Sequence, residues 1–538
     1  MLQADSPAVS AHAAHAEMVA QLRRNTGASE LIETHLSSLL IAGEQVYKLK
    51  KPLRFGFVDF STLAARHAAC EQELRLNRRT AAAWYLGLVA VRQGARGACF
   101  AAPDDEAAGL LLDWAVQLRR FDDRQRLDRV AQAGLLTAAM VDRLAETVAR
   151  FHHGLLPAPP DQDGDQNIQR WARDNLAELA ELVEGSVAAE VAALQRWTEL
   201  RAAELSALMQ ARRRSGCVRE VHGDLHLGNI FWADGEPVLF DALEFNQALR
   251  QTDTIGDLAF TFMDLQAHGL PRLAWRFIGA ALEACGDQAG LPLLAWWAVY
   301  RAAVRAKVVL LGAAALGDAA AQQAARAASR RYLDVALRLA GLVGAQARLR
   351  LVLMFGLSGA GKSRVAGLLV ERLAAEVLAW GGALRLRSDV ERKRLFALPP
   401  RARAAPGLYS QASNRRTYDR LQQLAEVVLE AGVSVVVDAA SLQRSERDAM
   451  RALAARHQAC FTLLVCDAPM SVLQARVEQR LRIGADASDA TLEVLAWQQR
   501  IAEWPASDEA ADCVRLDTDV PESELAARVQ ALGLDAGS

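Results

Sequence analysis

The sequence lacks a strong charge imbalance and a long uninterrupted apolar run. Its formal net charge is −2 over 538 residues, which argues against a protein that coats nucleic acid or an acidic membrane. The most apolar long segment, residues 296–316, contains Arg301, Arg305 and Lys307 and is too interrupted to span a bilayer. The N-terminal residues have neither the basic nor the apolar region of a signal peptide. We therefore expect a cytoplasmic protein without a membrane partner, and nucleic acid is a disfavoured partner.

Cysteine and lysine are also scarce. The seven cysteines are odd in number and never spaced as CxxC, which fits reduced thiols and not a disulfide framework or a zinc site. Most basic residues are arginine, whereas three of the few lysines cluster at Lys48, Lys50 and Lys51 and another is Lys362. A lysine among so many arginines indicates a need for a compact point charge, so these positions are candidate site residues.

The clearest motif is GLSGAGKS at residues 356–363, which has the GxxxxGKS spacing of a P-loop. It follows an apolar, strand-like run at 349–355 and opens a helical pattern, as the motif requires. The glycines allow backbone N–H groups to surround phosphate oxygens, Lys362 reaches the β- and γ-phosphates, and the Ser363 hydroxyl ligates Mg²⁺. ATP and Mg²⁺ are therefore the expected cofactors. The predicted nucleotide-binding residues are Gly356, Ser358, Gly359, Ala360, Gly361, Lys362 and Ser363.

The chain is too long for one hydrophobic core, and its patterns change near residue 345. Strand-like runs at 383–389, 433–441, 461–469 and 513–518 alternate with helices after the P-loop, which predicts a doubly wound, parallel, five-stranded α/β sheet. Before it, two strand pairs flank a helix and are followed by mainly helical sequence, an α+β pattern. We predict two domains, residues 1–343 and 346–538, with a short joint near 341–348.

A second constellation lies in the first domain. The segment HGDLHLGN, residues 222–229, has the spacing D-x-x-x-x-N, and a buried strand ends at Asp241 twelve residues later. This resembles the catalytic loop and metal-binding Asp of the aminoglycoside-phosphotransferase and protein-kinase-like superfamily. The resemblance implies a bilobal kinase-like fold with a helical C-lobe. It also implies that Asp224 is the catalytic carboxylate and that Asn229 and Asp241 hold Mg²⁺.

The resemblance extends upstream to an expected Lys–Glu ion pair. Lys48 lies on the second strand, where the superfamily places a lysine for the phosphates, and Glu73 lies on the next helix. Lys50 points to the same face of the strand and remains an alternative to Lys48, as Glu71 does to Glu73. No GxGxxG loop precedes these strands, which weakens a protein-kinase interpretation.

Several polar residues near these motifs have a structural interpretation. Asp253 and Asp257 resemble the acidic pair that follows the family's metal-binding loop, and we expect them to cap or brace. His222 and His226 are expected to orient the catalytic loop, because no third metal ligand accompanies them. Arg301 and Arg305 lie one helical turn apart and are expected to be helix-surface charges, with an anionic substrate as the alternative.

The second domain carries its own candidate chemistry. Asp389 and Arg392 form a D-x-x-R pattern that resembles the substrate side of gluconate-kinase-like, polynucleotide-kinase-like and zeta-toxin-like P-loop kinases. The resemblance implies that Asp389 is the base for an acceptor hydroxyl, that Arg392 holds the substrate, and that Asp438 steadies Mg²⁺. Arg480 and Arg482, beside a Gly-Ala-Asp loop, resemble the arginines of a lid that closes over the phosphate. Arg476 is equally a lid or a surface residue.

Together these features predict a fusion of two ATP-dependent phosphotransferases that act on hydroxyl groups of small molecules. Two other functions remain open: a P-loop ATPase or kinase regulated by a nucleotide-binding but non-transferring first domain, and a second domain that phosphorylates nucleic-acid ends or a nucleotide sugar. The residues identify neither acceptor, and the fold resemblance does not imply antibiotic resistance. The oligomeric state is not indicated.

Overall fold

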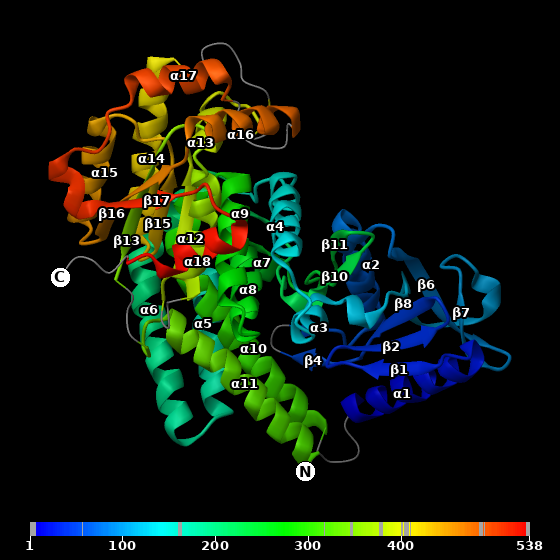
Figure 1. Ribbon diagram of the computed structural model, residues 1–538. Helices are drawn as coiled ribbons and strands as arrows, with labels where there is room; N and C mark the ends of the chain where they lie inside the picture. Colours follow the sequence, from blue (N-terminus) through cyan, green and yellow to red (C-terminus); the bar gives the residue numbers. More distant parts are fainter. Residues whose placement is uncertain are drawn as a thin grey trace. The chain divides into compact units, whose positions relative to one another are not determined.

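A computed structural model describes residues 7–55, 58–159, 164–316, 318–344, 348–375, 380–399, 402, 408, 410–483, 488 and 490–533. The chain divides into two compact units, the first made of Met1–Ala188, Ala202–Asp264 and Arg301–Tyr332, and the second of Ala189–Arg201, Leu265–Tyr300 and Leu333–Ser538. Figure 1 labels their helices and strands. Helices with residues in both units are α6 (Gly185–Arg214), α8 (Thr254–Ala267), α10 (Leu294–Leu316) and α11 (Ala319–Leu339). Within the described residues, no helix has the length and apolar character needed to cross a membrane.

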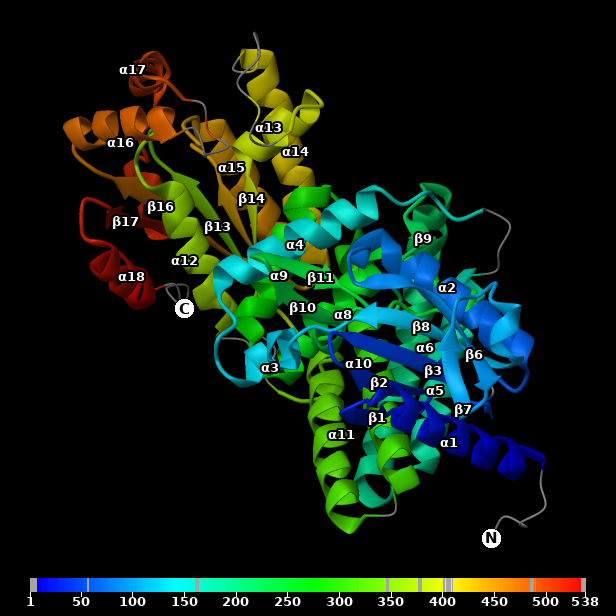
Figure 2. The same cartoon turned by 90° about the vertical axis from the view of Figure 1, so that its right-hand side faces the viewer.

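The first unit begins with an antiparallel six-stranded sheet in the order β1-β2-β3-β8-β6-β7. Its strands are β1 (Glu30–Glu33), β2 (Ser37–Ala42), β3 (Gln45–Lys50), β6 (Tyr85–Gly94), β7 (Gly97–Ala101) and β8 (Leu110–Arg119). Helix α1 (Pro7–Thr26) packs on β7 and β2, and α2 (Leu63–Ala81) packs on β8 and β6 (Figure 2). Helix α2 begins after Thr62, whose side chain caps it by accepting a hydrogen bond from the Ala65 N–H. The predicted strand pairs are confirmed, and β1 and β7 extend the sheet at its two edges.

The rest of the first unit is mainly helical, as the sequence predicts. Besides the helices shared with the second unit, it contains α3 (Leu127–Gln132), α4 (Ala138–His153), α5 (Gly164–Glu181) and α7 (Gln247–Arg250). The catalytic-loop segment lies between β9 (Val218–Glu220), which pairs with β12 (Gln251–Asp253), and a hairpin of β10 (Ile230–Ala233) and β11 (Glu236–Leu239). Asp234 and Gly235 turn this hairpin with φ of 52° and 81°, the left-handed pair that a two-residue hairpin needs.

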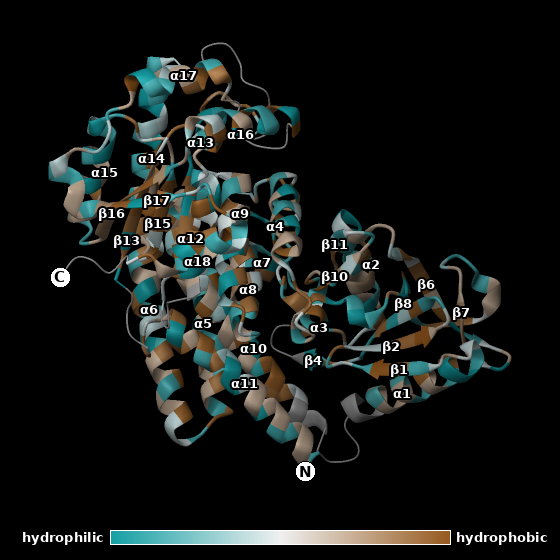
Figure 3. Ribbon diagram, viewed as in Figure 1, coloured by the Kyte–Doolittle hydropathy of each residue, from teal (hydrophilic) through white to brown (hydrophobic). Residues whose placement is uncertain are grey.

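The second unit contains the predicted five-stranded parallel sheet, in the order β14-β15-β13-β16-β17. Its strands are β13 (Arg350–Phe355), β14 (Ala383–Arg387), β15 (Ser434–Asp438), β16 (Cys460–Asp467) and β17 (Cys513–Asp517). Every residue of β15 is buried, and the brown colour of β13 and β16 in Figure 3 marks equally apolar strands. Such runs are typical of parallel strands covered on both faces.

Helices on the two faces of this sheet make it doubly wound. Helix α12 packs on β13, β14 and β15, α14 packs on β14 and β15, and α15 packs on β13 and β16. The helices are α12 (Lys362–Ala375), α13 (Ser388–Leu395), α14 (Gln411–Glu430), α15 (Arg444–Arg456), α16 (Met470–Ile483), α17 (Leu492–Ile501) and α18 (Glu522–Ala531).

Helix α9 (Pro271–Cys285) precedes the predicted joint but belongs to the second unit, where it packs against α12 and β14. Its Trp275 is 1% exposed and covers Gly382 at the start of β14. Arg387, the last residue of β14, donates a hydrogen bond to Glu283 of α9 at 3.3 Å. The predicted limits of 1–343 and 346–538 therefore place α9 in the first domain, whereas the compact units place it in the second. Residues 345–347 of the joint lie outside the described residues.

The contact between α9 and the sheet predicts the effect of one substitution. A Cβ at Gly382 would overlap the indole ring of Trp275, so Gly382→Ala should lower the free energy of unfolding by about 1–3 kcal/mol. Gly533→Ala is the control, because no atom lies within 4 Å of its added Cβ. Urea unfolding of the full chain measures both. Equal stability of the two variants would show that α9 is not seated on β14.

Candidate active sites

Two lysines of the first unit bind one carboxylate. Lys48 and Lys50 lie two residues apart on β3 and leave the strand on the same face. The Nζ of Lys48 lies 2.8 Å from Oε1 of Glu73, and the Nζ of Lys50 lies 2.5 Å from Oε2. Burial opposes ionisation of Glu73, but the two lysines outweigh it and lower the pKa of its carboxyl to about 2. Both predicted alternatives for the lysine therefore form the ion pair.

The surroundings distinguish Lys48 from Lys50. The Nζ of Lys48 also lies 2.5 Å from Oδ1 of Asp241, the predicted metal ligand, whereas Lys50 pairs with Glu244. Burial disfavours the charged form of Lys48, yet Asp241 and Glu73 raise its pKa well above the ordinary value. Lys48 thus faces the predicted site and Lys50 lies behind it.

The alternative carboxylate, Glu71, lies elsewhere. Its Oε1 is 3.8 Å from Nε2 of His67, and its side chain is 55% exposed. The structure therefore brings Glu73, and not Glu71, to the lysines.

The catalytic-loop carboxylate is held by its predicted neighbour. The side-chain amide of Asn229 donates to Oδ2 of Asp224 at 2.9 Å and to the main-chain oxygen of Asp224 at 3.0 Å. Burial opposes ionisation of Asp224, but His226, with Nε2 3.6 Å from Oδ2, and Arg305 keep the pKa of this carboxyl well below its usual range. Asp224 is therefore an ionised acceptor, suited to receive a hydrogen bond from a substrate hydroxyl.

The conformation of this loop depends on the histidines and on Asp257, as predicted. Asp257 accepts hydrogen bonds from the N–H groups of His222 at 2.8 Å and Gly223 at 2.9 Å. The His222 ring lies 3.0 Å from the carbonyl oxygen of Phe240, and burial lowers its pKa, so a neutral ring donates this bond. The ring of His226 accepts from the Gly228 N–H at 3.1 Å.

Asp253 caps rather than catalyses. It accepts a hydrogen bond from the Ile255 N–H at 3.0 Å near the start of α8 and forms an ion pair with Arg212 at 2.7 Å. This confirms the capping interpretation.

Asp241 follows the β10–β11 hairpin in a conformation that few residues adopt. Its φ is 60°, and its N–H donates to the Tyr85 hydroxyl at 3.2 Å. Aspartate tolerates the left-handed region better than most residues. The side chain is 39% exposed, so it is open to solvent while Lys48 holds Oδ1.

The expectation of helix-surface charge for Arg301 and Arg305 was wrong. Arg301 is 3% exposed and lies over the ring of Phe260 at 4.9 Å. A nitrogen of the Arg305 guanidinium lies 3.2 Å from Nε2 of His226, next to the catalytic loop. A charged residue in a helix is ordinarily exposed, but the residues around both arginines in α10 are mostly apolar, which is typical of a buried helix.

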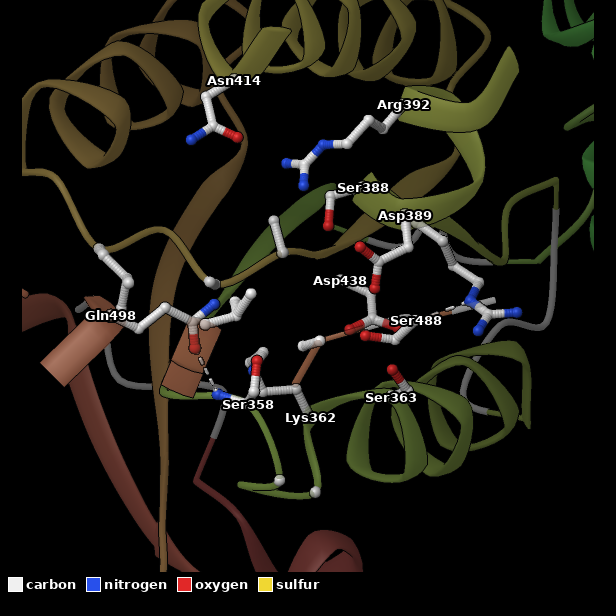
Figure 4. Close-up of a pocket in the computed structure, with 18 of the residues that line it drawn as sticks. Ser358, Lys362, Ser363, Ser388, Asp389, Arg392, Asn414, Asp438, Ser488 and Gln498 are labelled. Carbon is white, nitrogen blue, oxygen red and sulfur yellow. Dashed lines mark hydrogen bonds and ion pairs between the residues drawn. The ribbon is translucent and has the colours of Figure 1, made fainter. Parts of the chain in front are cut away.

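The P-loop lines a cavity of about 300 Å³ in the second unit (Figure 4). Gly359 and Gly361 have φ of 86° and 77°, and a Cβ at Gly359 would lie 2.6 Å from the Leu473 carbonyl oxygen, so the loop needs glycine there. The Nζ of Lys362 donates to the carbonyl oxygens of Gly356 and Leu357, each at 2.8 Å. Burial lowers the pKa of Lys362. The lysine is therefore folded onto its own loop, beside the cavity.

Ser363 and Asp438 are adjacent at the edge of this cavity. The Ser363 hydroxyl is hydrogen-bonded to the Asp438 carboxylate, and burial raises the pKa of that carboxyl. Among the described residues, Oδ2 of Asp438 is buried without a hydrogen-bond partner. A hydroxyl and a carboxylate with one oxygen free of hydrogen bonds suit Mg²⁺, which is usually held by one or two protein oxygens plus phosphates. No cluster of three or more His, Cys, Asp or Glu side chains arranged for a metal occurs in the part of the chain that the structure describes.

Residues of α13 and α14 line the cavity together with the P-loop. Figure 4 shows Arg392 and Asn414 on the side of the cavity opposite Lys362. Asp389 lies between that side and the P-loop. Asp389 was expected at the end of a strand, but β14 ends at Arg387 and Asp389 lies in the first turn of α13. This position still corresponds to the carboxyl end of the parallel sheet, where doubly wound folds bind ligands.

The three arginines considered for a lid differ in their contacts with the cavity. Arg480 lines the cavity and donates to the Ala490 carbonyl at 3.3 Å. Arg476 also lines it, but donates to the Gly359 carbonyl at 3.3 Å and to Thr518, so it braces the P-loop. Arg482 is exposed and does not line the cavity. The adjoining Gly-Ala-Asp loop lies outside the described residues.

Three cavity residues were not anticipated. Gln498 of α17 accepts a hydrogen bond from the Ser358 N–H of the P-loop at 2.8 Å. The Tyr418 hydroxyl accepts from the N–H of Ser441 at 2.8 Å, and Ser441 has a φ of 49°. Burial raises the pKa of Glu446 to about 7. No local sequence signal marks these residues, because their roles arise from helices packed together in space.

Comparison with known proteins agrees with this geometry. Residues 57–242 match the model of the phosphotransferase enzyme family, and residues 351–505 match the model of the AAA domain. The uncharacterized proteins Rv2004c of Mycobacterium tuberculosis (strain ATCC 25618 / H37Rv) and Mb2027c of Mycobacterium bovis (strain ATCC BAA-935 / AF2122/97) are each 32% identical over 477 residues, 88% of this chain and 90% of each relative. The chain belongs to the family of these mycobacterial proteins.

Within this family the chain is a two-domain ATP-dependent phosphotransferase, with an aminoglycoside-phosphotransferase-like domain followed by a P-loop kinase-like domain. Similar solved structures include the Mycobacterium tuberculosis APS kinase CysC in complex with AMPPNP and APS, at 27% identity, 34% of this chain, 95% of that chain and a TM-score of 0.26. Amicoumacin kinase hAmiN in complex with AMP-PNP, Ca²⁺ and Ami is 14% identical over 60% of this chain and 96% of that chain, with a TM-score of 0.34.

The raised pKa of the half-buried Glu446 predicts a pH effect on stability. Between its ordinary pKa of 4.5 and about 7, the unfolded chain ionises this residue while the folded chain keeps it protonated. Its contribution to stability is full below pH 4.5 and is lost as the pH rises to about 7. Glu446→Gln stays neutral and can keep its contact with the Gln443 N–H, so its Tm should rise relative to the parent between about pH 5 and about pH 8.

Thermal unfolding at the two pH values measures this difference. Glu430→Gln, at the exposed end of α14, is the control and should show no such change. A Tm difference for Glu446→Gln that stays constant with pH would contradict the raised pKa.

Proposed function

We propose that each domain transfers the γ-phosphoryl group of ATP to a hydroxyl group of a small molecule. The observation that carries this proposal is the cavity of the second unit, in which Asp389 faces Lys362 and Ser363 across a space of about 300 Å³. A carboxylate placed opposite a phosphate-binding loop is the arrangement that phosphoryl transfer to a hydroxyl requires, because catalysis depends on positioning and on stabilisation of charge.

In the second domain, the backbone N–H groups of the P-loop and Lys362 would bind the phosphates. Asp389 would accept the proton of the acceptor hydroxyl as its oxygen attacks the γ-phosphorus and ADP leaves. Arg392 would orient the acceptor, and Arg480 would stabilise the charge on the transferred group. Arg482 has no part in this scheme, because it lies away from the cavity.

In the first domain, Asp224 would take the same part as Asp389, and Lys48 would bind the phosphates of a second ATP. The ionised state of Asp224 and its two hydrogen bonds from Asn229 support this role. Glu73 holds the Lys48 ammonium group in place.

Mg²⁺ fits both sites. Ser363 and Asp438 would hold it in the second domain, and Asn229 and Asp241 in the first, since each pair supplies oxygen ligands and Asp241 contacts the phosphate-binding Lys48. When bound, the ion neutralises phosphate charge during transfer. The near-zero net charge of the chain supports small-molecule acceptors over long nucleic acid.

The test is acceptor-dependent release of ADP by the full chain, screened over polyols, sugars, amino alcohols, aminoglycosides and nucleosides. Loss of the carboxylate should reduce turnover by about 100- to 10,000-fold. For a second-domain acceptor, Lys362→Met and Asp389→Asn should each cause this loss while Asp224→Asn leaves turnover intact. For a first-domain acceptor the pattern should be reversed.

Other patterns would contradict the proposal. ADP release that needs no acceptor would indicate an ATPase. Turnover that only second-domain substitutions abolish, over the whole acceptor panel, would make the first domain a nucleotide-sensing module. A steep fall of acceptor affinity with salt would indicate a nucleic-acid acceptor.

A further inference from the structure

Five charged side chains of the first unit form one continuous chain of ion pairs. Glu73 stands at its centre, with Oε1 2.8 Å from Nζ of Lys48 and Oε2 2.5 Å from Nζ of Lys50. From Lys48 the chain continues to Oδ1 of Asp241 at 2.5 Å, and from Lys50 to Oε1 of Glu244. Carboxylates and ammonium groups alternate, so each cation lies between two anions.

The two end members of this series of ion pairs, Asp241 and Glu244, belong to the same loop. Asp241 and Glu244 are three residues apart, so the ion pairs join β3, α2 and the loop after β11 into a closed set. The side chains of Lys50 and Glu244 are 1% and 7% exposed, whereas that of Asp241 is 39% exposed. One half of the set is therefore inside the domain and the other half opens to solvent.

Lys50 is placed to hold its neighbours and not a phosphate. Its ammonium group also lies 5.6 Å from the centre of the Phe60 ring, on the buried side. A carboxylate with one cationic partner can turn about its terminal bond, whereas partners on both oxygens fix its plane. Lys50 thereby orients the oxygen of Glu73 that receives Lys48, and Glu244 balances its charge.

We propose that Lys50 and Glu244 are positioning residues of the first domain, which hold Glu73 and the Asp241 loop so that Lys48 and Asp241 meet at the site. The left-handed φ of 60° at Asp241 is a conformation that contacts with the surrounding structure maintain, and the ion pairs of this loop are such contacts. The proposal rests on the proposed function only for its kinetic readout.

The test uses the full chain with Lys362→Met, so that ATP binding reports the first domain. This Lys362→Met protein is the parent, and it is compared with the same protein carrying Lys50→Met or Lys50→Met/Glu244→Gln. The double variant is needed because Lys50→Met alone leaves Glu244 buried without its cation. The double variant should regain the parent's Tm, yet the gain in ATP affinity caused by Mg²⁺ should fall about 10-fold. With an acceptor, kcat should fall about 100-fold with little change in KM, as expected for misplaced groups.

Lys51→Met is the matched control, since Lys51 directly follows β3 but its ammonium group pairs with the half-exposed Glu33 and not with Glu73. It should behave like the parent in each measurement. Titration calorimetry with and without Mg²⁺ gives the affinities, and thermal unfolding gives Tm.

A double variant with the parent's Tm and the parent's Mg²⁺-dependent affinity would overturn the proposal, because Lys50 would then be structural only. If the double variant does not fold, Glu244→Gln alone provides the test, because it keeps both lysines on Glu73. An unchanged ratio of ATP affinities with and without Mg²⁺ would then show that Glu244 is not a positioning residue. If the proposed transfer fails, no acceptor gives ADP release in any variant, while the binding ratio still separates parent from variant. If the Lys362→Met parent binds no ATP in the first domain, both the positioning role and the proposed phosphoryl transfer by that domain are overturned.

Discussion

The carboxylate of Glu73 has no exposed surface, and two ammonium groups share it. An isolated buried charge is costly, so a buried carboxylate persists only where cations surround it closely. Lys48 and Lys50 meet this condition, and each must in turn be balanced, by Asp241 and Glu244. These ion pairs connect the sheet, helix α2 and the loop of Asp241. The geometry of the first site therefore follows from the need to pair its buried charges.

The second domain meets the same electrostatic problem mainly with its backbone. The P-loop offers N–H groups, which carry only partial charge and are fixed by glycines with positive φ. Lys362 is the P-loop cation, and burial lowers the pKa of that lysine. Asp438 lies nearby with a raised pKa, again because of burial. The charged groups of the first site are therefore paired with one another. In the second site Lys362 is held by carbonyl oxygens of its own loop, and Oδ2 of Asp438 has no hydrogen-bond partner among the described residues.

Local patterns were enough to predict much of this architecture. The alternation of buried strands and helices after residue 349 predicts the parallel sheet, and the P-loop and HGDLHLGN motifs place Lys362 and Asp224, because the residues of each motif are contiguous. Glu446 and Gln498 escaped prediction, since each reaches the cavity from a helix whose position depends on packing. Arg301 was misjudged for a related reason: a charged residue in a helix is ordinarily exposed, whereas Arg301 is buried and lies over the ring of Phe260.

The position of α9 has a consequence for the second site. Its Glu283 accepts a hydrogen bond from Arg387, and the Nε of Arg387 lies 4.0 Å from Oδ2 of Asp438 at the cavity. Trp275 of the same helix covers Gly382 beside β14. A fragment that begins near residue 346 would lose both contacts and expose an apolar surface of the sheet. Sequence motifs alone would place the whole second domain after the joint. The sheet that carries the P-loop, however, packs against a helix from about seventy residues earlier. Each activity therefore has to be measured in the full chain.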